Sequence, residues 1–330
     1  MGTPVDPVPA PVQAALAAAA DAPGYPLTAG SVALRAAITA WVARACGATG
    51  EFGILPTVGS KEFVALLPTL LGLGPDDVVV IPRLCYPTYE VGAQVAGCRL
   101  VRADSMLALG PTRRVGLVWL NSPSNPTGQV LPAAHLRKMV DWARERGAIV
   151  ASDECYLPLG GPTPPVSALE VCAGDYTGVL AVHSLSKRSN LAGYRAAFVA
   201  GDPALVAELL AVRKHAGLIV PEPIQAAMVA ALSDESDVAD QVARYDARRA
   251  LLRAALVEAG FTITHSEAGL YLWVTRDEDC WSTVDWLARR GILAVPGEFY
   301  GPTGVRHVRL ALTETDERVA AAARRITGRG

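Results

Sequence analysis

The sequence predicts an α/β fold, with a mostly parallel central sheet that has helices on both faces, and a smaller α+β domain after it. Three observations support this prediction. Short runs rich in β-branched residues alternate with helical stretches over the first two thirds of the chain. After about residue 221 this alternation gives way to one long helical stretch and several short strand-like runs. The 330 residues, 51% of them apolar, are enough for two domains with substantial cores.

Local signals place the elements of the larger domain, which we assign to residues 25–221. Residues 1–24 form an N-terminal arm that we expect to pack with the small domain. Its opening is rich in proline and therefore extended, and a helix follows at 12–20. Ser31 is a predicted N-cap for a helix over 32–46, which Gly47 ends. The predicted strands lie at 78–81, 99–101, 115–120, 148–152, 179–182 and 197–199, and helices between them include 62–71 and 132–146.

The small domain is assigned to residues 222–330. A long helix is predicted over 234–259, and Gly260 ends it. The last helix begins near Thr315. Strand-like runs between these two helices lie at 261–264, 270–275, 292–295 and 307–312.

Composition narrows the class of protein. The formal net charge of −2 and the absence of a basic patch argue against a nucleic-acid partner. No apolar run is long enough to span a bilayer, and no basic segment precedes the alanine-rich run at 14–20, so we expect no membrane partner. Six scattered cysteines without a C-x-x-C pair indicate reduced thiols in a cytoplasmic enzyme. The five histidines lack metal-ligand spacing, so we expect no catalytic metal.

Polar side chains follow the predicted strands at the points where open α/β sheets bind their ligands. An acid, a lysine, a phenol, an amide and hydroxyls would meet there beside a helix N-terminus. Such a set suits a phosphorylated, nitrogen-containing aldehyde cofactor. The side chains are Asn125 after the strand at 115–120, Asp153 and Tyr156 after 148–152, Ser184 and Lys187 after 179–182, and Ser60 and Lys61 before the helix at 62–71.

Three segments resemble the fold-type I, class I and II aminotransferases, which depend on pyridoxal 5'-phosphate (PLP). They are S-N-P-T-G at 124–128, S-D-E-C-Y at 152–156 and S-L-S-K-R-S-N-L-A-G-Y-R at 184–195. Each piece is short, but their order and spacing agree with the family from about residue 25 to residue 312. The resemblance implies the PLP-dependent transferase fold type I, and transamination as the default among the reactions that this fold hosts.

The resemblance implies roles for the residues around the cofactor ring. Lys187 would be the Schiff-base lysine and would move a proton at the substrate Cα; by itself it could equally be a surface lysine. Asp153 would keep the pyridine nitrogen protonated, with capping of the following turn as the alternative. Tyr156 and Asn125 would bond the phenolic oxygen, although Asn125 could also serve as a turn residue. Tyr86 resembles the aromatic residue that stacks on the ring.

Further positions match the family's phosphate and substrate ligands. Ser60 and the backbone amides of Ser60 and Lys61, together with Ser184 and Arg195, would hold the phosphate. Tyr25 resembles a tyrosine that reaches the phosphate from the neighbouring subunit, which implies a homodimer with shared active sites. Arg309 resembles the arginine that binds the substrate α-carboxylate.

Two nearby residues compete with these assignments, and one family segment is missing. Tyr89 is the alternative to Tyr86 for stacking, whereas Arg306 lies off the motif of Arg309 and is expected to be solvated. The family carries a further segment before the G-x-P-x-x-P stretch at which this chain starts. That departure concerns domain closure and substrate contacts, not the cofactor site.

A closer resemblance concerns the substrate. The runs N-S-P-S-N-P-T-G, H-S-L-S-K-R-S-N-L-A-G-Y-R, V-R-K-H-A-G and H-S-E-A-G-L-Y-L-W resemble actinobacterial succinyldiaminopimelate aminotransferases. This implies ping-pong transfer from glutamate to N-succinyl-2-amino-6-oxopimelate, which gives N-succinyl-LL-2,6-diaminopimelate for lysine and cell-wall biosynthesis. Candidates for the distal carboxylates, each more readily explained as a surface or salt-bridge residue, are Arg83, Arg188, Arg213 and Lys214.

Other functions remain open at this point. The chain could act on another amino acid or a secondary metabolite, or catalyse another reaction at Cα such as decarboxylation or elimination. A non-catalytic sensor is a more distant alternative. No helix-turn-helix motif or basic patch favours it.

Overall fold

The computed structural model describes residues 2–105, 114–161 and 164–328. Its main sheet has seven strands in the order β1-β7-β6-β5-β4-β2-β3. Strands β3, β2, β4, β5 and β6 run parallel, and β7 is antiparallel to both β6 and β1. The mostly parallel sheet is therefore confirmed. The strand bounds are β1 Gly53–Val58, β2 Val78–Ile81, β3 Arg99–Arg102, β4 Val115–Asn121, β5 Ile149–Asp153, β6 Val179–Ser184 and β7 Ala196–Gly201.

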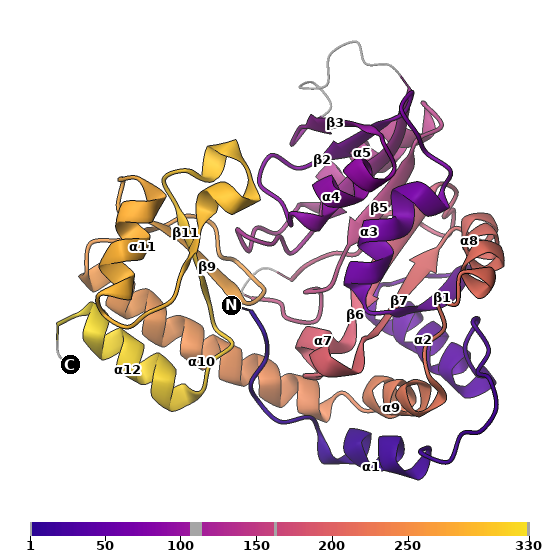
Figure 1. Cartoon of the computed structure of the whole chain (residues 1–330), viewed down its shortest axis with the longest axis horizontal. Coiled ribbons are helices and arrows are strands. Elements are labelled where there is room, and N and C mark those ends of the chain that lie inside the picture. The colour runs from indigo at the N-terminus through magenta and orange to yellow at the C-terminus, as the bar shows by residue number, and fades with distance from the viewer. Residues whose placement is uncertain (1, 106–113, 162–163, 329–330) are drawn as a thin grey trace.

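Helices cover both faces of this sheet, as predicted (Figure 1). Alternate residues of the buried strands point to opposite faces, so two separate cores form. One core lies under α1 (Ala10–Ala18), α2 (Val32–Ala45), α5 (Ala133–Arg144), α6 (Ala168–Val171) and α9 (Glu222–Ser233). The other lies under α3 (Ser60–Leu70), α4 (Thr88–Val95) and α8 (Pro203–His215), and it continues into the small domain.

The small domain is built on a four-stranded antiparallel sheet in the order β10-β11-β9-β8. The long helix α10 runs from the large domain along the small one, where α12 lies beside it (Figure 1). The helix bounds are α10 Ser236–Glu258, α11 Cys280–Ala288 and α12 Asp316–Ile326, and the strand bounds are β8 Thr262–Ile263, β9 Tyr271–Thr275, β10 Val295–Pro296 and β11 Val308–Ala311. The division at residue 222 stays a prediction.

Most predicted element ends agree with the structure. Ser31 caps α2 by accepting a hydrogen bond from the Leu34 amide at 3.2 Å, and Thr315 caps α12. The strand predicted over 292–295 is wrong at its start. The Ile292 amide bonds the Leu287 carbonyl and closes the end of α11, so only Val295–Pro296 pairs with β11.

One strand was not predicted at all. Among the described residues, β1 pairs with β7 alone. It contains Pro56, which an edge strand tolerates because the missing N–H can face away from the ladder.

The N-terminal arm crosses both domains. Helix α1 packs on α9, and the extended segment before it runs along α10. Asp6 on this segment pairs with Arg248 of α10 at 2.7 Å. The N-terminal end of the arm lies between the small-domain sheet and α7 (Leu185–Arg188) (Figure 1). No helix in the described ranges is long and apolar enough to cross a bilayer.

Candidate active site

The carboxyl ends of β4, β5 and β6 bring the predicted residues to one edge of the sheet. Asn121 at the end of β4 is in register with Asp153 at the end of β5, and β5 pairs with β6. Ser184 ends β6 and caps the short helix α7, which carries Lys187. Segments far apart in the sequence therefore meet because parallel strands end side by side.

Lys187 lies in a partly buried position close to two arginines. Its Nζ donates a hydrogen bond to the Gly2 carbonyl of the N-terminal arm. Burial lowers the Lys187 pKa to about 8, and the charges of Arg309 and Arg195 add to that effect while Cys155 opposes it. The amine therefore loses its proton at a lower pH than an ordinary lysine, which favours its use as a nucleophile.

Asp153 is a buried carboxylate with two neutral donors. Tyr89 Oη donates to Oδ2 at 2.6 Å, and the Cys155 amide donates to Oδ1 at 3.2 Å. Burial raises the pKa of Asp153, and the hydrogen bonds from Tyr89 and Cys155 work against that rise. An acid held in this way suits pairing with a protonated ring nitrogen.

The loop at 121–129 joins the two domains at Asn125. Asn121 Oδ1 accepts from the Asn125 amide at 2.7 Å, and Asn121 Nδ2 donates to the Asp153 carbonyl at 2.9 Å. Peptide bonds Ser122–Pro123 and Asn125–Pro126 are cis. Arg309 Nη1 on β11 donates to Asn125 Oδ1 at 2.7 Å. Asn125 thus both shapes the turn and meets the predicted carboxylate-binding arginine.

Aromatic rings surround this arginine. The Arg309 guanidinium lies 3.9 Å from the Tyr271 ring centroid and 5.0 Å from that of Tyr300. Tyr271 Oη is 3.0 Å from Tyr156 Oη. A Cβ built on Gly2, whose φ is +87°, would lie 2.7 Å from Tyr271 Oη, so the arm fits here only with glycine.

The cradle proposed for the phosphate consists of the N-terminus of α3 and the Arg195 guanidinium beside it. Gly59 precedes the helix with φ +78°, and a Cβ on it would collide with the Arg195 guanidinium. Ser60 and Lys61 follow as the first helical residues. Amides at a helix N-terminus and a guanidinium suit a phosphate dianion. The cradle, the acid at Asp153 and the amine at Lys187 together fit PLP.

Of the two tyrosines considered for stacking, Tyr89 is the wrong one. It is fully buried, stacks on Trp119 with ring centroids 4.8 Å apart, and has its hydroxyl on Asp153. Tyr86 is partly exposed, edge-on to Tyr89, and has Lys61 Nζ 5.7 Å from its centroid. Stacking by Tyr86 stays a prediction.

Two of the candidate cations for distal carboxylates are buried and paired, in agreement with the salt-bridge explanation preferred for them. Arg188 bonds the Ala231 carbonyl at 3.0 Å and lies 3.4 Å from Glu235. Arg213 holds Glu62 through two hydrogen bonds of 2.7 and 2.9 Å. Arg213 and Glu62 thereby fasten α8 to α3.

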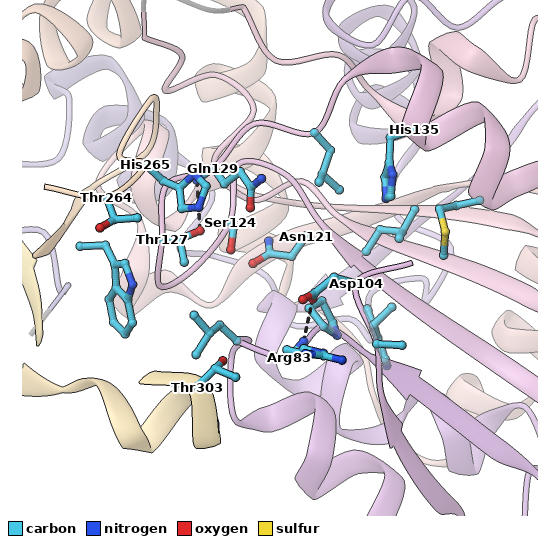
Figure 2. Close-up of a pocket in the computed structure, with 18 of the residues that line it drawn as sticks. Arg83, Asp104, Asn121, Ser124, Thr127, Gln129, His135, Thr264, His265 and Thr303 are labelled. Carbon is cyan, nitrogen blue, oxygen red and sulfur yellow. Dashed lines mark hydrogen bonds between the residues drawn. The ribbon is translucent and has the colours of Figure 1, made fainter. Parts of the chain in front are cut away.

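The remaining arginines and lysine lie elsewhere. Lys214 is exposed on α8, which packs on β1. Arg306 is 56% exposed and pairs with Asp277 at 2.8 Å, which confirms its solvated interpretation. Arg83 lines a separate cavity of about 440 Å³ between the large domain and residues of the small one. Figure 2 shows this cavity, with Asp104 accepting from the Arg83 amide; its lining, within the described residues, does not include Lys187.

Three buried side chains that could ligate a metal lie close together next to Asp153. Among the described residues, Cys46, Glu154 and His183 have ligand atoms within 4.8 Å of one another. Their types and distances would suit a metal ion. Burial, however, raises the pKa of Cys46, raises that of Glu154 to about 7 and lowers that of His183 to about 3. Each of these shifts favours the uncharged form of the side chain.

Sequence reasoning missed several residues of the site. Asn121 directly follows the strand predicted at 115–120, and Tyr271 is the second residue of the strand predicted at 270–275, so their positions could have signalled them. Cys155, between Asp153 and Tyr156, interacts with Ser60 and Lys187. Gly2 could not have been found, because only the path of the arm brings it to Lys187.

Comparison with known proteins gives one consistent family. The model of the family "Aminotransferase class I and II" matches residues 2–326. A probable aminotransferase of Mycobacterium tuberculosis is 61% identical over 331 residues, 99% of this chain and 79% of that protein. The 4-dedimethylamino-4-oxo-anhydrotetracycline transaminase OxyQ of Streptomyces rimosus is 56% identical, over 99% and 92% of the two chains. The solved probable N-succinyldiaminopimelate aminotransferase of Thermus thermophilus has 28% identity and a TM-score of 0.90, over 100% and 93%.

Proposed function

This chain belongs to the class I and II aminotransferases, has their fold type I and depends on PLP, and we propose that Lys187 is the residue at which amino transfer takes place. One observation carries this proposal. Lys187 Nζ is a partly buried amine that bonds the Gly2 carbonyl, and its pKa is lowered by burial and by the charges of Arg309 and Arg195, with Cys155 opposing. In the proposed site Arg195 would bind the cofactor phosphate and Arg309 the substrate carboxylate, and Cys155 follows Asp153 by two positions.

Each residue has a separate task in the proposed mechanism. Bound PLP supplies a carbonyl that exchanges with amino groups and a ring that withdraws electrons from the substrate Cα. Lys187 Nζ would move a proton between that Cα and the aldehyde carbon of the cofactor. The fork of Arg309 holds the α-carboxylate, and Asp153 holds a proton on the ring nitrogen. Tyr156 and Asn125 hydrogen-bond the phenolic oxygen.

In this proposal the phosphate is bound by the first amides of α3 together with Ser60, Ser184 and Arg195. The placement of Ser60 and these amides at the N-terminus of α3 supports it, because the helix dipole and the unpaired amides there favour an anion. The arm and the small domain cover Lys187 from the other side, since Gly2 and Arg309 both approach it. This cover restricts the access of water to the reacting amine, which is partly buried.

For the substrates, we propose glutamate as donor and N-succinyl-2-amino-6-oxopimelate as acceptor in a ping-pong reaction. The sequence runs of the succinyldiaminopimelate aminotransferases and the likeness to the Thermus protein support this choice. Arg188 and Arg213 are paired elsewhere. Lys61, which lies beside Tyr86, is a cation that could bind a distal carboxylate.

A second acceptor is favoured by the 56% identity to OxyQ. That relative is named for a tetracycline intermediate with a ring ketone. A polycyclic ketone would need an apolar, aromatic surface in the site. Tyr271 and Tyr300 provide aromatic rings beside Arg309, and Tyr86 provides one beside Lys61.

The test is a cofactor spectrum of the purified, PLP-loaded protein, titrated with amino donors. Loss of the visible band with L-glutamate and with N-succinyl-LL-2,6-diaminopimelate would support the substrate pair. Loss with glutamate only, and amination of a 4-oxo-anhydrotetracycline, would transfer the assignment to the second acceptor. Decarboxylation or elimination would give no 2-oxoglutarate from glutamate. A Lys187→Ala variant that turned over at the wild-type rate would contradict the mechanism and favour a sensor.

We also propose a homodimer in which Tyr25 reaches the partner's phosphate site. Tyr25 is 99% exposed, and Leu27 and Val32 near it are largely exposed too. Mixed dimers of Tyr25→Ala and Lys187→Ala subunits should regain activity at one site, because that site takes an intact lysine and an intact tyrosine from different chains. Mixtures that stay as inactive as the parents would place Tyr25 outside the neighbouring site. A cytoplasmic location remains an expectation.

A further inference from the structure

Tyr89 occupies a position that its role as a core aromatic does not explain. It is the second residue of α4, fully buried, with its ring stacked on Trp119 of β4 at an interplanar angle of 16°. This stacking directs the hydroxyl across the sheet end to Asp153 Oδ2, 2.6 Å away. A purely apolar position would have been filled as well by phenylalanine.

The hydroxyl is a donor in this contact. Burial and the neighbouring Asp153 raise the pKa of Tyr89 far above its ordinary value, so the phenol keeps its proton. On the other carboxylate oxygen, the Cys155 amide donates at 3.2 Å. Both of these donors are uncharged, and each is fixed by the fold, one by α4 and one by the turn after β5.

We propose that Tyr89 is a positioning residue that orients Asp153 and holds it ionised, so that the proton between Asp153 and the cofactor resides on the ring nitrogen. This inference rests on the proposed function. A hydrogen bond to the carboxylate stabilises its charged form relative to its protonated form. Without the phenol, the buried carboxyl would compete better for the shared proton, and the ring would withdraw electrons less strongly.

The ring-nitrogen proton gives a readout that a merely structural role would not move. PLP labelled with ¹⁵N in its ring is bound to the wild type and to Tyr89→Phe, and the ¹⁵N chemical shift is measured. Tyr89→Phe keeps the ring and its stacking on Trp119 but lacks the donor. We expect a protonated nitrogen in the wild type, a shift toward the neutral form in the variant, and PLP affinity lower by about tenfold, the order of one hydrogen bond to a charged group.

Tyr176→Phe is the matched control. Tyr176 is also buried, accepts from the Thr49 amide and donates to the Thr49 carbonyl, both at 2.8 Å. It belongs to the core on the opposite face of the sheet. Its variant should lose stability but leave the ¹⁵N shift and PLP affinity unchanged.

A second pair of variants tests whether Tyr89 acts through the acid. Asp153→Asn should give a neutral ring nitrogen, and Tyr89→Phe added to it should cause no further change in the shift. In this double variant no buried carboxylate is left without the phenol donor, and an unsatisfied buried charge is the costlier loss. It therefore remains informative if Tyr89→Phe alone folds poorly.

The outcomes separate the two levels of the argument. A wild type that binds no PLP would contradict the proposed function itself. PLP bound normally, with the same ¹⁵N shift in Tyr89→Phe as in the wild type, would overturn the inference about Tyr89 alone. A further shift in the double variant relative to Asp153→Asn would also overturn it.

Discussion

The anchoring of the N-terminal arm makes a quantitative prediction through Asp6. Its carboxylate accepts from Arg248 Nη1 at 2.8 Å and Nη2 at 2.7 Å, and from Gln241 at 2.9 Å, with little exposure of either member of the ion pair. Breaking a buried ion pair costs about 3–5 kcal/mol. Arg248 keeps Asp316 at 2.6 Å, so we expect Asp6→Asn to lower the free energy of unfolding by about 2 kcal/mol.

The effect should reach the active site, because the arm continues from Asp6 to Gly2 at Lys187. With a loosened arm, the KM for glutamate should rise more than kcat falls, and proteases should cut the arm of the native protein faster. Urea unfolding measures the change in the free energy of unfolding, and steady-state kinetics measure the separate changes in KM and kcat.

Asp316→Asn is the matched control for this prediction. Asp316 also pairs with Arg248 but is 67% exposed, and pairs that involve such exposed groups contribute about 0–1 kcal/mol. Equal losses of stability in the two variants would refute the assignment of Asp6 as the buried partner. An unchanged KM in Asp6→Asn would refute the link between the arm and substrate binding.

The pH dependence has a definite sign. Burial by itself would raise the Asp6 pKa, but the hydrogen bonds from Arg248 and Gln241 lower it below 3.8. The stabilisation is therefore complete above the unfolded pKa of about 3.9 and is lost as pH falls through the lower folded value. The stability difference between the wild type and Asp6→Asn should shrink over that acidic range.

Three further predictions concern the cofactor site. Modification of Lys187 by an amine-directed reagent in the apo-protein should reach half its maximal rate near pH 8, and a midpoint near 10.5 would contradict the burial effect. Tyr156→Phe should raise the pH midpoint of the cofactor's visible band, because a hydrogen bond that favours the deprotonated form is lost; a lower or unchanged midpoint would remove Tyr156 from its role. Gly59→Ala should weaken PLP binding, as measured by equilibrium dialysis, because the new Cβ displaces Arg195; unchanged affinity would show that Arg195 is not a phosphate ligand.

The sequence alone was sufficient for the fold class, and it named residues that the structure brings together at one edge of the sheet. The apolar runs and the turn residues between them predicted the bounds of β2 without error. They predicted those of β4, β5 and β6 within one or two residues, because buried parallel strands are short continuous apolar runs. The carboxyl ends of those strands then predicted Asn125, Asp153 and Lys187. These residues are local signals, since each follows its own strand directly.

Only the tertiary structure decided which partners those residues have. Tyr89 meets Asp153 across 64 positions, and Arg309 meets Asn125 across 184. Burial and pairing of Arg188 and Arg213 could not be predicted either, because a charged side chain in a motif-adjacent loop gives no local sign of the acid or carbonyl that it contacts. Contacts of this kind depend on how the strands, the arm and the small domain pack, and their geometry is fixed by the sum of many weak interactions rather than by any one segment.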